Sequence, residues 1–184
     1  MSLQIYILGS LWERDIHPYE IKKRITENTG GTVNITDGNL YYNFDSLHKK
    51  GYIEKIEVVQ SDNYPDKSFY RITDKGRTGL RNMIYKSFAK PSDVKSLMAP
   101  LLFLQLVDRN RIVFLLQEAI EQREVELTTM QQRIVEGAAS SNETEEQQLY
   151  AFIVRYSLSR REHELAALKE MLGVVEQMHN GQSS

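Results

Sequence analysis

The sequence contains no cysteine, which excludes disulfide bonds, thiolate zinc sites and a cysteine nucleophile. It also lacks any run of 18 apolar residues, so we expect no membrane-spanning helix and no contact with a membrane. Residues 1–10 have neither a basic segment nor a small-residue cleavage site, and we expect no secretory signal. A chain without cysteine suits a reducing compartment. These absences together predict a cytoplasmic protein.

Motifs of catalysis and cofactor binding are missing as well. The chain has no P-loop, no dinucleotide-binding glycine pattern after a strand, and no nucleophile elbow. Its four histidines are scattered and do not form the H-E-x-x-H pair of a zinc enzyme. We therefore expect no enzyme, no catalytic residue, no cofactor and no metal, and we assign no cofactor-binding residue.

The two halves of the chain differ in charge. Residues 1–90 carry 14 lysines and arginines against 11 aspartates and glutamates, whereas residues 91–184 carry 9 against 14. A basic half beside an acidic half favours contact of the first half with a polyanion. The excess is modest, however, and an ordinary solvated surface explains it equally well.

Periodicity and turn residues predict the elements of the first half. Pro18 suits the first turn of a helix, Thr36 or Asp37 can cap the next one, and Gly51 ends it. A turn-forming cluster at 61–66 separates two β-branched segments. We expect helices over residues 3–14, 18–29, 37–50 and 74–88 and strands over residues 52–60 and 68–73.

The second half, which begins after Pro91, is expected to be almost wholly helical. One helix begins at Ser92 or Asp93 and continues through a leucine-rich segment to Leu106. Two long helices then run from Asp108 to about residue 136 and from about residue 143 to 178. The fold class is therefore mainly α with a small β-hairpin: a winged helix-turn-helix domain over residues 1–90 and a helical dimerisation domain over residues 91–184.

The helix expected over residues 37–50 has one apolar and one polar face. Asparagine can bond an adenine edge, tyrosine and serine can reach bases or phosphates, and lysine suits the DNA backbone. The tip of the expected hairpin offers an aromatic and a cation. The candidate DNA-binding residues are therefore Asn39, Tyr42, Asn43, Ser46, Lys49 and Lys50 on the helix, with Tyr64 and Lys67 on the hairpin. A solvated polar face and a plain connecting turn are the alternatives.

The last helix, about 36 residues or roughly 54 Å long, carries an apolar seam that shifts phase midway. Two winged domains need a fixed spacing to read two half-sites about one helical turn apart, which favours a homodimer. The candidate dimerisation residues are Leu149, Phe152, Tyr156, Leu165, Leu168 and Leu172. The alternative is a helical hairpin within one chain. Arg123, the polar break in the preceding long helix, could meet an anion between helices or extend to the surface.

Three segments resemble the PadR family of transcriptional regulators. Gly38-Asn39-Leu40-Tyr41 followed by Leu47, Gly51 and Ile53 is similar to the recognition-helix motif of that family. His17-Pro18-Tyr19-Glu20-Ile21 resembles its H-G-Y-E-I turn, and residues 67–77 are similar to its wing strand. The resemblance covers roughly residues 3–80, and it implies a winged helix and a homodimer with swapped or packed C-terminal helices.

The resulting hypothesis is a sequence-specific, DNA-binding transcriptional regulator. We expect a repressor that binds a roughly palindromic operator on double-stranded DNA as a homodimer, with a small-molecule effector of unknown identity as a further partner. The alternative is a protein-interaction module, in which the winged helix is a scaffold and the acidic helices dock a partner protein.

Overall fold

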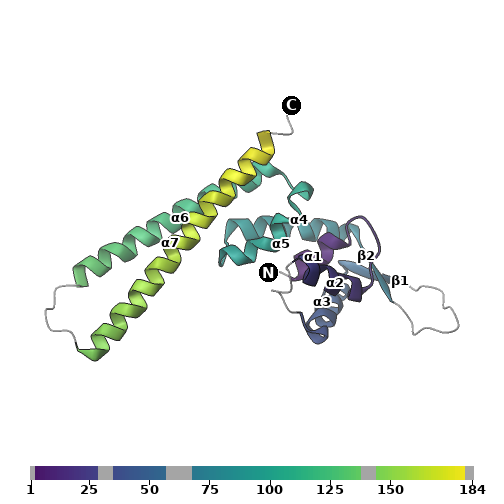
Figure 1. The fold of residues 1–184 in the computed structure, drawn as a ribbon. Helices are drawn as coiled ribbons and strands as arrows, with labels where there is room; N and C mark the ends of the chain where they lie inside the picture. The colour runs from purple at the N-terminus through teal and green to yellow at the C-terminus, as the bar shows by residue number, and fades with distance from the viewer. Residues whose placement is uncertain (1–2, 29–34, 57–67, 138–143, 181–184) are drawn as a thin grey trace. The chain divides into compact units, whose positions relative to one another are not determined.

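The computed structural model describes residues 3–28, 35–56, 68–137 and 144–180. The chain divides into two compact units, one formed by residues 1–87 with 96–107 and the other by residues 88–95 with 108–184. Figure 1 shows the helices and the small sheet of these units. The assignment of residues 1–90 to DNA binding and of residues 91–184 to dimerisation is functional and stays a prediction.

The described residues between 3 and 89 form three helices, a two-stranded antiparallel sheet and a fourth helix, in that order along the chain (Figure 1). This order confirms the expected fold class, a mainly helical chain with a small β-hairpin. The elements are α1 (Leu3–Ser10), α2 (Pro18–Asn28), α3 (Asp37–Lys49), β1 (Ile53–Ile56), β2 (Phe69–Ile72) and α4 (Asp74–Ala89).

The core of the first unit forms around α1 and α3, which pack against each other. Helix α3 buries the apolar face expected from its sequence, with Leu40, Phe44 and Leu47 all at most 1% exposed. The ring of Phe44 lies 4.8 Å from that of Tyr70 on β2. This packing fixes which side of α3 faces inward and therefore turns its polar residues outward.

The connection from α3 to β1 depends on Gly51, whose φ of 71° is a left-handed conformation that favours glycine. The two strands then pair with Ile53 opposite Ile72. Ile16, in the segment between α1 and α2, adds an isolated bridge to Tyr70 at the other edge of β2. The sheet is therefore held by backbone bonds on both sides of β2.

The leucine-rich segment before Val107 is not the single helix that we expected. It is broken into η1 (Val94–Leu97), α5 (Met98–Leu101) and η2 (Leu104–Leu106), where η denotes a 3₁₀ helix. Pro100 lacks a backbone N–H and is tolerated in the first turn of a helix but not further along. The N–H groups of Leu102 and Phe103 bond Ala99 and Pro100 three residues back, so the α-helical pattern ends there.

The second unit contains two long helices, α6 (Arg109–Gly137) and α7 (Glu145–Asn180), which pack against each other. Polar contacts pair the start of α6 with the end of α7, as between Arg109 and Met178, so the two helices run antiparallel (Figure 1). Their interface buries Leu116, Leu168 and Val175. Within the described ranges, no helix is both long and apolar enough to cross a membrane.

Two charged side chains of the second unit hold the segment that precedes η1. The Arg123 guanidinium on α6 donates to the carbonyl oxygen of Pro91 at 2.5 Å and to that of Ser92 at 3.4 Å. The backbone N–H of Val94 donates to a carboxylate oxygen of Glu164 on α7 at 2.7 Å. Arg123 therefore donates hydrogen bonds to backbone carbonyl oxygens. This differs from both expectations from the sequence, an anion between helices and extension to the surface.

Candidate nucleic-acid interface

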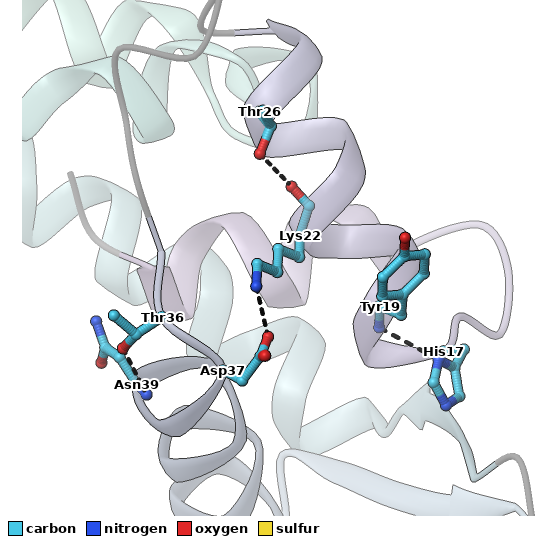
Figure 2. A network of polar contacts seen from close by, with 7 residues as sticks. All are labelled: His17, Tyr19, Lys22, Thr26, Thr36, Asp37 and Asn39. Carbon is cyan, nitrogen blue, oxygen red and sulfur yellow. Dashed lines mark hydrogen bonds and ion pairs between the residues drawn. The ribbon is translucent and has the colours of Figure 1, made fainter.

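The start of α3 is fixed by two polar contacts, both visible in Figure 2. Thr36 has the extended backbone of an N-cap residue, and its hydroxyl accepts the backbone N–H of Asn39 at 3.3 Å. The Lys22 ammonium on α2 lies 2.6 Å from a carboxylate oxygen of Asp37. The predicted start of the helix near Thr36 is thereby confirmed, and α2 is tied to the first turn of α3.

The polar face of α3 lies open to solvent in the described chain. Tyr42 is 71% exposed, Asn39, Lys49 and Lys50 are exposed, and Asn43 and Ser46 are half-buried. The six helix residues of the candidate DNA-binding set therefore share the side of α3 that the core leaves free. Their role in DNA binding stays a prediction.

Asn39 and Asn43 are bonded to each other one helical turn apart. The Asn43 Nδ2 donates to Asn39 Oδ1 at 2.9 Å and to the Asn39 backbone oxygen at 2.8 Å. The two amides are therefore held in one arrangement on the outer side of the helix.

Gln4, which the sequence analysis did not single out, extends from α1 to the same face. Its Nε2 donates to the Ser46 hydroxyl at 3.4 Å, and its Oε1 accepts from the Lys50 ammonium at 3.4 Å. No local pattern in the sequence indicates this contact, because Gln4 and Lys50 are 46 residues apart. Gln4 therefore joins the candidate site as a residue that positions two of its members.

The positive charge of this face comes from the C-terminal end of α3. Lys22 is neutralised by Asp37, and Arg71 forms a two-pronged ion pair with Asp15 at 2.6 and 2.9 Å. Lys50 bonds only the neutral Gln4 amide among the described residues and so keeps its net charge. Cations at a helix C-terminus complement its dipole, and Lys49 and Lys50 are both exposed there.

Tyr70 of β2 contacts Phe44 on the buried side of α3, and the Asp45 carboxylate lies near its phenol. Burial raises the pKa of the Tyr70 phenol, and the nearby Asp45 carboxylate raises it further. Tyr70 therefore stays neutral at physiological pH, which suits its ring contact with Phe44 in the core.

Two members of the candidate DNA-binding set, Tyr64 and Lys67, lie outside the described residues. The ends of the two strands that lead to them are described, at Ile56 and Phe69. Their proposed contact with DNA stays a prediction from the sequence.

The candidate dimerisation residues fall into two groups on α7. Leu165 and Leu168 are at most 9% exposed and Leu172 is half-buried, on the side of α7 that packs against α6. Leu149, Phe152 and Tyr156 are 67%, 60% and 62% exposed. The helical hairpin, which was the alternative to a homodimer, is therefore present within the chain as α6 and α7. It leaves the N-terminal half of the apolar seam of α7 exposed.

Trp12 and Phe103 line a pocket of about 490 Å³ within the first unit. Arg14 and Arg24 lie on its wall, and the guanidinium carbon of Arg77 lies 4.5 Å from the centre of the Trp12 ring. Glu13 lies on the same wall, and Arg14 is ion-paired with Glu20 at 3.1 Å, so side chains of both charges accompany the aromatic rings. Across the described ranges, histidine, aspartate and glutamate nowhere gather in a group of three that could hold a metal ion.

Comparison with known proteins assigns the first unit to a family. The model of the family described as transcriptional regulator PadR-like matches residues 7–82. A Lysinibacillus sphaericus protein described as uncharacterized protein X is 33% identical over 92 residues, which are 50% of this chain and 83% of that protein. This chain belongs to the PadR-like family. The recognition-helix, turn and wing-strand motifs quoted from the sequence all lie within or at the edge of the matched region.

Two solved structures are similar to this PadR-like chain. Bacillus subtilis PadR in complex with operator DNA is 21% identical, with 95% of this chain and 99% of that chain covered and a TM-score of 0.44. A transcriptional regulator from Clostridium thermocellum is 30% identical, with 46% of this chain and 78% of that chain covered and a TM-score of 0.42.

Proposed function

We propose that this PadR-like chain binds double-stranded DNA through the polar face of α3 and acts as a sequence-specific transcriptional regulator. The observation that carries the proposal is the exposure of that face: the core holds Leu40, Phe44 and Leu47 inside, so Asn39, Tyr42 and Lys50 are free to enter a groove. An α-helix fits the major groove of B-DNA, where base edges differ in their donors and acceptors. Membership of a family of transcriptional regulators supports the same function.

The regulator acts as a homodimer in this proposal, with the exposed seam of α7 against a second copy. Leu149, Phe152, Ile153 and Tyr156 are each at least 58% exposed and follow a spacing of three and four residues. This spacing places them on one stripe of the helix, away from the side that packs on α6. A second copy explains such a stripe best, because two DNA-reading units at a fixed spacing can bind a palindromic operator.

The repressor role and its release by an effector complete the proposal. The effector would be a small molecule that binds in the pocket beside the aromatic rings of Trp12 and Phe103. Trp12 is the single tryptophan of the chain, so its fluorescence reports binding without a label. Quenching that saturates with one molecule per chain and weakens DNA binding supports this role, and an unchanged DNA affinity at saturation contradicts it.

The deciding experiment is a titration of mixed-sequence duplex DNA with the full chain at several salt concentrations. A DNA-binding protein shows at least micromolar affinity at low salt, and the logarithm of its binding constant falls linearly with the logarithm of salt. A protein-interaction module that uses the winged helix as a scaffold shows almost no binding at any salt concentration. Genomic fragments recovered with the purified protein then give the operator.

A further inference from the structure

The amides of Asn39 and Asn43 form a donor–acceptor unit on the exposed face of α3. A side-chain amide has two N–H protons, and the Asn43 Nδ2 group directs one to Asn39 Oδ1 and one to the Asn39 backbone oxygen. Asn43 therefore has no proton left for a base. Its free atom is Oδ1, an acceptor.

The complementary donor belongs to Asn39. Its Oδ1 accepts from Asn43, which leaves the Asn39 Nδ2 protons without a partner among the described residues. Asn39 is exposed and Asn43 is half-buried, and the two residues lie one turn apart on the same side of the helix. A donor from one residue thus stands beside an acceptor from the next turn.

Adenine presents the matching pair in the major groove, an acceptor at N7 and a donor at N6. Guanine presents acceptors at both N7 and O6, so the Asn43 oxygen would face another oxygen there. We propose that Asn39 and Asn43 read one adenine jointly, with Asn39 donating to N7 and Asn43 accepting from N6. A single asparagine supplies both bonds in the usual adenine contact, and here the division follows from the bonding of Asn43.

The location of the pair favours base contact over phosphate contact. Residues in the N-terminal part of a recognition helix commonly reach base edges. Asn39 is in the first turn of α3, where Thr36 caps its N–H and the Lys22–Asp37 ion pair holds the helix start (Figure 2). The two amides are therefore presented by a helix end that is itself fixed. This inference rests on the proposed function, because it assumes that α3 binds DNA.

The test combines selection from randomised duplexes with affinity measurements on the selected site. Wild type should select an adenine in each half-site and bind about tenfold more weakly when that adenine becomes guanine. Asn39→Asp replaces the free Nδ2 donor of residue 39 with a carboxylate oxygen, which is an acceptor. The other carboxylate oxygen can still accept the bond from Asn43 Nδ2. The preference at that position should then move from adenine to cytosine, whose N4 group is a donor. Asn82→Asp, the same change on an exposed residue of α4, is the matched control and should leave the preference unchanged.

A comparison of single and double variants distinguishes one contact shared by Asn39 and Asn43 from two independent contacts. Asn39→Ala and Asn43→Ala should each remove the adenine preference at the same base position, and the double variant should lose no more than either one. Losses at two different base positions, or an unchanged preference in Asn39→Asp that still binds DNA, overturn the inference and leave the proposed function intact. If wild type binds no duplex at low salt, the proposed function fails, and the joint reading of adenine fails with it.

Discussion

Gly76, in the first turn of α4, lies directly against the backbone carbonyl of Tyr52. A side-chain carbon at Gly76 would overlap the Tyr52 oxygen and would also lie 2.9 Å from Ile72 Cγ1. The same Tyr52 oxygen accepts the backbone N–H of Thr73 at 3.0 Å, and the Thr73 hydroxyl caps the N–H of Gly76 at 3.0 Å. The junction between the hairpin and α4 therefore depends on the absence of a side chain at one position.

Gly76→Ala should destabilise the protein, because the clashing partner is backbone and cannot swing away as a side chain would. We expect a loss of about 1–3 kcal/mol in the free energy of unfolding, measured by chemical denaturation. Gly38→Ala in α3 is the matched control, since a side-chain carbon there meets nothing within 4 Å. It should leave stability unchanged or raise it by about 0.4–1 kcal/mol. Equal stability of the two variants would contradict the proposed role of Gly76.

Lys50→Ala should weaken binding to all DNA sequences. It should also make the negative slope of log affinity against log salt shallower by about 0.9, the value expected for one phosphate contact. Lys95→Ala, an exposed lysine that belongs to the second unit, is the control and should leave the slope unchanged.

Gln4→Ala should also weaken binding, because it releases the Lys50 ammonium from its bond at 3.4 Å. In a Lys50→Ala background, Gln4→Ala should add little, and full additivity would show that Gln4 acts independently of Lys50.

The Asp15–Arg71 pair should make stability depend on acid pH. The hydrogen bond from Arg71 lowers the pKa of Asp15 below its ordinary value of 3.8, with a smaller lowering from the arginine charge. Because the folded-state pKa is the lower one, the stabilisation is present above pH 3.8 and is lost as the pH falls through the folded-state value. Asp15→Asn should therefore be less stable than wild type at pH 7, with the difference shrinking towards pH 2. Thermal unfolding at several pH values, with Asp45→Asn as an exposed control, measures this, and a constant difference would refute it.

Prediction from sequence was most successful where local chemistry decides the structure. Thr36 caps α3, Pro18 begins α2, and the apolar face of α3 is buried as its spacing of three and four residues indicates. These features depend on neighbours within a few residues. The exposed polar face of α3 could be located for the same reason, because an inward apolar stripe fixes the outward polar one.

Contacts between distant segments could not be predicted in this way. The contact of Gln4 with Lys50 and the bond from Arg123 to Pro91 join residues that are 46 and 32 positions apart. Pro100 is the local signal for the broken segment, because a helix interior does not tolerate proline, whereas the leucine spacing around it favours one continuous helix. Long-range polar bonds leave no periodic pattern, because only the folded backbone brings the two partners together.

Phe152→Glu should separate the proposed dimer into monomers, since it places a charge in the exposed seam of α7. Phe152 is 60% exposed in the single chain and its ring stacks on that of Tyr156 at 6.4 Å, so the change should not disturb the core of the hairpin. Sedimentation or light scattering should give half the wild-type mass, and binding to a palindromic site should fall more than binding to a half-site. Gln148→Glu adds the same charge at an exposed position of the same helix and should leave the mass unchanged. A monomeric wild type would rule out the homodimer.

Arg123→Met should release residues 91–94 from the α6–α7 hairpin while keeping an apolar stem of similar length. The bonds lost are those to the carbonyl oxygens of Pro91 and Ser92, and bonds of a charged donor contribute about 1.5–3 kcal/mol each at most. Because Arg123 is only half-buried, we expect a loss near the lower end of this range in the free energy of unfolding. Hydrogen exchange should also quicken at the Val94 amide, whose bond to Glu164 relies on the same local structure. Arg160→Met, on an exposed face of α7, is the control, and equal protection of Val94 in both variants would mean that Arg123 does not hold this segment.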